Sequence, residues 1–241
     1  EYRTKHHLLM RLICPRPHLN PVLNLVFMPN YDTLLAGCED GVFAWIIQDF
    51  RKQRFAEDRE LPNMLLYRVP TMEIKIPTNR EPCFDGLARL SENLVVVKCV
   101  EEGEIYLLLS RKRAASSKKI VTAEVLGQLR WQTTDEIYIN VTARPGLGAV
   151  VCGDNEGTIW VYDLQEHVVN EENGTKFKVK PILEWPECSV GGNREEDPQV
   201  KESINSGFKN PVVNATDISS DGAFLVAVTD NNLVCIWNFS G

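Results

Sequence analysis

Histidines and adjacent glutamates are the side chains of this sequence best suited to acid–base or metal chemistry. The four histidines are scattered, at positions 6, 7, 18 and 167, and glutamate pairs stand at 101–102 and 171–172 between apolar runs. Charged side chains in such segments are normally solvated. The sequence contains no nucleophile elbow, phosphate-binding loop or HExxH zinc motif. It therefore predicts no catalytic residue, no metal site and no cofactor, and a protein that is not an enzyme.

The seven cysteines argue against both a disulfide framework and a zinc site. Their number is odd, and no two are spaced as Cys-x-x-Cys. Cys38, Cys99, Cys152 and Cys235 lie inside apolar runs, where cysteine behaves as a small hydrophobic residue. We therefore expect a reducing compartment, the cytosol or the nucleus. No apolar stretch reaches about 18 residues, so no membrane span is expected.

The charge balance bears on the kind of partner. The formal net charge is −7 and charged residues make up 24% of the chain. This balance disfavours sequence-specific nucleic-acid binding and suits a basic partner better. The basic run RKRAASSKK at residues 111–119 is an exception. It has two interpretations, a solvated loop or a nuclear-localisation or phosphate-contact patch.

The apolar residues come in short runs bounded by turn residues, a pattern typical of β-strands. The runs recur as a unit of strand, loop, strand, tight polar turn and strand, with copies at residues 22–47, 84–109, 137–164 and 212–239. The last strand of each copy carries a large apolar residue, which we predict to be a blade-core position. These residues are Trp45, Leu108, Tyr162 and Trp237.

The phase of the copies supports a true repeat. Leu108, Tyr162 and Trp237 each stand five residues after the last Gly or Asn of the turn, and Trp45 stands four residues after Gly41. Glycine and asparagine tolerate the positive φ that tight hairpins require. Fourth strands are expected within residues 64–69 or 72–76, within 120–126 and within 177–185.

Two segments carry the signature of a WD repeat. Residues 153–163, GDNEGTIWVYD, resemble the end of such a repeat, with Tyr162 and Asp163 where Trp-Asp is usual. Residues 226–238, VAVTDNNLVCIWN, resemble another. We therefore expect an all-β fold, a WD40-type β-propeller with about four blades present of about seven in a full ring.

The partial propeller would cover residues 1–241. Its units are expected at about 1–78, 79–126, 127–186 and 211–241, with a mobile loop at 187–210. Open blade edges expose unpaired backbone groups. The missing blades are therefore expected to be cleaved, disordered or supplied by another chain or another part of the protein.

The chain also resembles one particular WD-repeat family, the EED / Extra sex combs proteins of the Polycomb repressive histone-methyltransferase complex. The similarity is to the C-terminal half of that family. It rests on FDGL at 84–87, VLGQL at 125–129, DEIY at 135–138, GTIWVYDL at 157–164 and SSDGAFLVAV at 219–228.

This resemblance implies a site and partners. One propeller face would hold the trimethyl-lysine of a histone H3 tail in an aromatic cage, where ring faces attract the quaternary ammonium. The other face would bind a SET-domain histone methyltransferase subunit. Two adjacent positions that hold cage aromatics in the family correspond to Tyr138 and Ile139 here. Only the first of them is aromatic, so Tyr138 is the methyl-lysine cage candidate. An ordinary core or rim tyrosine is the alternative.

Our main functional hypothesis is a nuclear, non-catalytic WD-repeat scaffold of a Polycomb-type histone methyltransferase complex, active in transcription repression. Its partners would be the methyltransferase, other Polycomb subunits and a histone H3 tail, with no membrane partner. Two alternatives stay open among binding proteins: a generic WD-repeat adaptor, or a chromatin protein similar to the origin-associated leucine-rich-repeat and WD-repeat proteins. An enzyme built on a propeller is the alternative from another class.

Overall fold

The structure is a computed structural model. It describes residues 11–15, 21–28, 33–47, 67–109, 120–132, 134, 136–165 and 211–239. The basic run 111–119, the expected mobile loop 187–210, all four histidines, the second glutamate pair and the fourth strand expected at 177–185 lie outside these described residues. Within them, no helix is long and apolar enough to cross a membrane.

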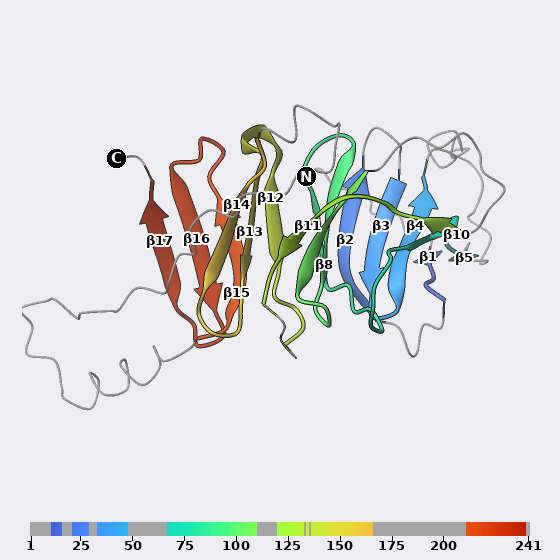
Figure 1. Ribbon diagram of the computed structural model, residues 1–241, viewed down its shortest axis with the longest axis horizontal. Helices are drawn as coiled ribbons and strands as arrows, with labels where there is room; N and C mark the ends of the chain where they lie inside the picture. Colours follow the sequence, from blue (N-terminus) through green and yellow to red (C-terminus); the bar gives the residue numbers. More distant parts are fainter. Residues whose placement is uncertain are drawn as a thin grey trace, which may run out of the picture.

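The described residues form four sheets of antiparallel hairpins that follow one another in chain order (Figure 1). The first sheet contains β2 (Val22–Met28), β3 (Thr33–Cys38), β4 (Gly41–Ile46) and β6 (Met72–Lys75). The second contains β7 (Gly86–Arg89), β8 (Leu94–Cys99), β9 (Glu104–Leu109) and β11 (Glu124–Arg130). This arrangement confirms the all-β, propeller-type fold expected from the sequence.

The third and fourth sheets each have three strands within the described residues. The third contains β12 (Val141–Arg144), β13 (Ala149–Gly153) and β14 (Ile159–Asp163), with a 3-10 turn at Pro145–Leu147. The fourth contains β15 (Val213–Ile218), β16 (Phe224–Thr229) and β17 (Val234–Asn238). A separate short parallel pair joins β1 (Arg11–Leu12) to β5 (Tyr67–Arg68).

The segment expected to be one fourth strand, within residues 120–126, is divided between two sheets. Its first part, β10 (Ile120–Thr122), pairs in parallel with β6 of the first sheet. Only the part from Glu124 onward pairs with β9, and β11 continues to Arg130. The chain therefore crosses from one sheet to its neighbour at Ala123, which links the first two blades by backbone hydrogen bonds.

The hairpin turns use the residues that the sequence singled out. Gly103, Gly157 and Asn232 have φ values of 61°, 87° and 64°, the left-handed region that glycine and asparagine tolerate. In the third sheet, Asp154 Oδ1 also accepts the turn N–H groups of Glu156 and Thr158, at 2.9 and 2.8 Å. The Asp154 side chain thus adds hydrogen bonds to the backbone of this turn.

The first strands of the sheets form one edge of the row. β7 contacts both β2 and β12, and β12 contacts β15. In a propeller the first strand of each blade lies nearest the central channel. We call this side of the molecule the inner edge.

The blade-core positions share one orientation. Leu108 packs against the first sheet, Tyr162 against the second and Trp237 against the third, so each faces the sheet before its own. Trp45 lies on the equivalent face of the first sheet, where Leu12 and Cys14 contact its cluster. Large side chains therefore fill the space between consecutive sheets at one repeated position.

Apolar side chains are exposed on the outer faces of both end sheets. Leu25 and Phe27 lie on the first sheet, on the same face as Trp45. On the fourth sheet, Val234 is 63% and Ile236 is 66% exposed, on the face opposite Trp237. Contiguous exposed apolar side chains mark surfaces that associate, and in a closed propeller such faces are covered by further blades.

We predict that the close approach of the third and fourth sheets requires glycine at position 153. A Cβ on Gly153 would lie 2.3 Å from the backbone oxygen of Val213. Gly153→Ala should therefore lower the free energy of unfolding by about 1–3 kcal/mol, measured by urea denaturation. Gly146→Ala is the matched control, because a Cβ there meets nothing within 4 Å. Equal effects of the two substitutions would contradict this packing.

We also predict that the 241-residue chain self-associates through its apolar end faces. Sedimentation velocity should show a mass that rises with concentration, and Val234→Thr/Ile236→Thr should weaken that association. Tyr138→Ala is the control, since Tyr138 is 62% exposed but precedes β12 at the inner edge, outside both end faces. A monodisperse monomer of the unsubstituted chain at all concentrations would refute the prediction.

Candidate functional site

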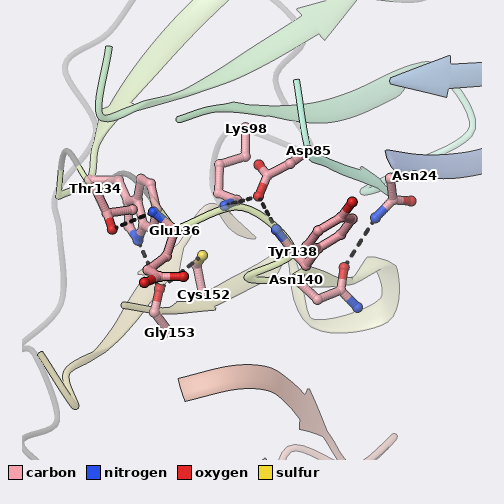
Figure 2. A network of polar contacts seen from close by, with 10 residues as sticks. Asn24, Asp85, Lys98, Thr134, Glu136, Tyr138, Asn140, Cys152 and Gly153 are labelled. Atoms are coloured by element: carbon pink, nitrogen blue, oxygen red, sulfur yellow. Dashed lines mark hydrogen bonds and ion pairs between the residues drawn. The ribbon is translucent and has the colours of Figure 1, made fainter. Parts of the chain in front are cut away.

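The candidate site lies at the inner edge, in the segment that leads into β12. Asn140 donates its backbone N–H to the Asn214 oxygen of β15 at 2.7 Å. Asn24 of β2 donates from Nδ2 to Asn140 Oδ1 at 3.2 Å (Figure 2). The segment therefore joins the first strands of the first and fourth sheets, and it brings together residues far apart in the sequence.

Tyr138 stands in this segment with an unusual backbone. Its φ is +73°, and the residue is 62% exposed. A residue with a Cβ pays about 1–2 kcal/mol for the left-handed region, so the surroundings must hold it there. Its N–H donates to Asp85 Oδ2 at 3.1 Å (Figure 2). Asp85 thus holds the backbone of the one residue that the sequence named as a cage candidate.

Asp85 is itself held by a buried lysine. Lys98 Nζ lies 2.8 Å from Asp85 Oδ2, and neither side chain is exposed to solvent. Burial raises the pKa of the Asp85 carboxyl, while the Lys98 charge and the Tyr138 N–H lower it. Asp85 Oδ1 is buried and has no hydrogen-bond partner among the described residues. Lys98 and Tyr138 therefore supply the side-chain and backbone donors that oppose the cost of burying this carboxylate.

The lysine is in turn supported by an aromatic ring. Lys98 Nζ lies 4.2 Å from the centroid of the Trp131 ring, within the range of a cation–π interaction. Trp131 Nε1 donates to the Gly153 oxygen of β13 at 3.0 Å. Trp131 therefore connects the ion pair of the second sheet to the third sheet, below the exposed tyrosine.

Ile139 does not line the site. It is 0% exposed and belongs to the apolar cluster between the second and third sheets. Adjacent residues with opposite surroundings are expected where an extended segment crosses the rim of a core. Of the two positions that the family resemblance aligned with cage aromatics, only Tyr138 therefore faces outward.

Other aromatic residues serve the blades. Tyr162 is buried and donates its hydroxyl to the Arg130 oxygen at 2.6 Å, and burial raises the pKa of that hydroxyl. Trp160 Nε1 donates to Asp154 Oδ2 at 2.8 Å, which joins the ring to the hairpin turn. Within the described residues, no group of three His, Cys, Asp or Glu side chains is arranged to hold a metal ion.

Sequence reasoning missed Lys98. The available signal was a lysine inside the apolar run LVVVKC of β8, because a charged residue in a doubly covered strand needs a partner. Asp85 belongs to the segment FDGL, which carries part of the family resemblance. The spacing of residues 85, 98 and 138 along the chain, however, does not indicate that they meet. Only the packing of three strands and a rim segment brings them together.

Stacked antiparallel sheets, polar hairpin turns and a repeated large residue facing the preceding sheet define a WD-repeat β-propeller. A solved structure described as the C-terminal WD40 domain of Sif2 matches 95% of this chain and 48% of its own, with a TM-score of 0.53 and 11% identity. This similarity shows the fold. The family model described as "Leucine-rich repeat and WD repeat-containing protein 1, WD domain" matches residues 1–240, and the chain belongs to this family.

Curated relatives agree with this assignment. The protein named Leucine-rich repeat and WD repeat-containing protein 1 is 31% identical in Danio rerio, over 221 residues that cover 89% of this chain. The Mus musculus protein of that name is 31% identical over 86% of the chain. The chain spans 27% and 29% of the lengths of these relatives. The matches thus support the leucine-rich-repeat and WD-repeat family named among the alternatives, and not the EED family in particular.

We predict that the two charges of the buried pair are energetically coupled. Lys98→Met leaves the Asp85 carboxylate buried and unpaired, and should lower the free energy of unfolding by about 3–5 kcal/mol. Asp85→Asn/Lys98→Met removes both charges and should be clearly less destabilising, as measured by urea denaturation. If the double variant is as unstable as Lys98→Met, the pair is not the coupled unit that the geometry indicates.

Proposed function

We propose that this chain is a non-catalytic WD-repeat adaptor that binds a basic segment of a partner protein at the inner edge, around Tyr138. The observation that carries the proposal is an exposed aromatic side chain on a strained backbone, supported by a fully buried ion pair. Strained conformations persist only where the surroundings over-determine them, and they cluster at functional sites.

The chemistry of the site favours a cationic ligand. An exposed tyrosine ring attracts an ammonium group over its face, with about 0.5–2 kcal/mol per contact. Glu136 is exposed two residues away, and the chain has a net charge of −7. These features together favour a lysine-rich or methylated-lysine segment, of which a histone H3 tail is our first candidate.

The cellular setting is part of the proposal. A histone ligand implies a nuclear location for the adaptor, and the six cysteines that the structure describes, none of which is in a disulfide, suit such a reducing compartment. Membership in the leucine-rich-repeat and WD-repeat family favours a chromatin adaptor of that type over a Polycomb scaffold. The finer hypothesis, a subunit that binds a SET-domain methyltransferase, rests on the resemblance to EED proteins. Co-purification of such a methyltransferase from nuclear extract would support it.

The proposal predicts that Tyr138 contributes to peptide binding. The chain should bind a histone H3 peptide with trimethyl-lysine more tightly than the unmodified peptide, in a fluorescence-anisotropy titration. Tyr138→Ala should weaken binding of the trimethylated peptide by about five- to tenfold, which corresponds to loss of one cation–π contact.

Phe239→Ala provides the control for this titration, because Phe239 is exposed but follows β17, outside the candidate site. It should leave the affinity unchanged. Equal affinity for the two peptides would exclude selective methyl-lysine recognition. An affinity unaffected by Tyr138→Ala would place the binding surface elsewhere on the propeller.

A further inference from the structure

We propose that Asp85 is a positioning residue for the recognition site: its buried carboxylate, held by Lys98, fixes the left-handed backbone of Tyr138 and so presents the tyrosine ring at the inner edge. The inference rests on the proposed function for the role of the ring. It adds a cause for the position of that ring: two side chains that are not exposed to solvent, Asp85 and Lys98, hold the backbone of Tyr138.

The first support is geometric. Tyr138 N–H and Lys98 Nζ both reach the same oxygen, Asp85 Oδ2, at 3.1 and 2.8 Å. The oxygen is therefore oriented by the lysine at the point where it accepts the tyrosine N–H. Loss of this acceptor would leave the φ of +73° without its side-chain support, and the backbone would relax toward a region that costs less.

The second support is the space made for the lysine. Gly86 lies opposite Lys98 in the ladder between β7 and β8. A Cβ on Gly86 would lie 3.0 Å from Lys98 Cβ and 2.8 Å from Val141 Cγ1. Glycine after Asp85 thus lets the lysine stem pass between the second and third sheets. The motif Asp85-Gly86 supplies both the carboxylate and the room for its partner.

The third support is energetic. A buried ion pair is a weak source of stability, because apolar residues of similar volume are often equally good or better. The pair here occupies a tightly packed position between two sheets, where Val96 and Val97 of the same strand pack well as apolar residues. What the charge pair provides in addition is an oriented acceptor, Asp85 Oδ2, for the N–H of the exposed Tyr138. Positioning of Tyr138 therefore accounts for a charge pair that core packing alone does not require.

The test compares two uncharged replacements of the pair, one of which keeps an acceptor at position 85 while the other does not. Asp85→Asn/Lys98→Met removes both charges but keeps an amide oxygen for the Tyr138 N–H. Asp85→Leu/Lys98→Met removes the charges and the acceptor together. Hydrogen exchange of the Tyr138 amide, followed by NMR, reports the hydrogen bond directly. Titration with the trimethyl-lysine histone H3 peptide reports the presentation of the ring.

We expect the Asn/Met variant to retain amide protection and peptide affinity. The Leu/Met variant should lose about tenfold in protection of the Tyr138 amide, the equivalent of one hydrogen bond, with Asn140 protection unchanged. Its peptide affinity should fall as far as in Tyr138→Ala. Retention of Tyr138 protection in the Leu/Met variant would overturn the proposal.

Two further outcomes separate this inference from the proposed function. If the unsubstituted chain does not bind the peptide but Tyr138 protection still follows the acceptor, the positioning role stands and the peptide proposal falls. If the peptide binds normally to the Leu/Met variant, the ring does not depend on Asp85. Should the Leu/Met variant fail to fold, exchange in the unsubstituted chain decides: an unprotected Tyr138 amide is incompatible with the inference.

Discussion

The whole structure depends on one packing constraint: each sheet is apolar on both faces, so each must be covered on both sides. Consecutive sheets meet this requirement for one another, with Leu108, Tyr162 and Trp237 filling the gap to the preceding sheet. The same constraint explains the exposed apolar side chains on the outer faces of the first and fourth sheets. Every sheet in such a row is covered on both faces only when the row closes into a ring.

The candidate site follows from this stacking. Sheets that pack face to face bring their first strands together at the inner edge, so a segment between blades can contact several sheets at once. Asn140 forms hydrogen bonds with both β2 and β15. Asp85, which directly precedes β7, accepts a hydrogen bond from Tyr138 in the same segment. The buried pair of Asp85 and Lys98 exists because the space between two sheets excludes water, and exclusion of water makes its orienting effect strong.

In a propeller, the residues that stabilise the fold and the residues available for recognition lie in different places. The interior of the blades uses large apolar residues at repeated positions, while the rim is free to carry residues that do not fit the repeat. Tyr138 is such a residue, with its exposed ring and its strained backbone. The chain belongs to the leucine-rich-repeat and WD-repeat family and represents between a quarter and a third of the length of its curated relatives.

Local features were determined by the sequence alone. Short apolar runs specified the strands, and Gly103, Gly157 and Asn232 specified the turns, because both depend on nearest neighbours and on backbone sterics. The repeat also located the large residues between sheets. Tertiary structure alone decided that residues 120–122 join the first sheet and that Lys98 meets Asp85 beneath Tyr138. These contacts join residues distant in the chain, and their energies arise from burial between sheets, which a linear pattern of residue types does not encode.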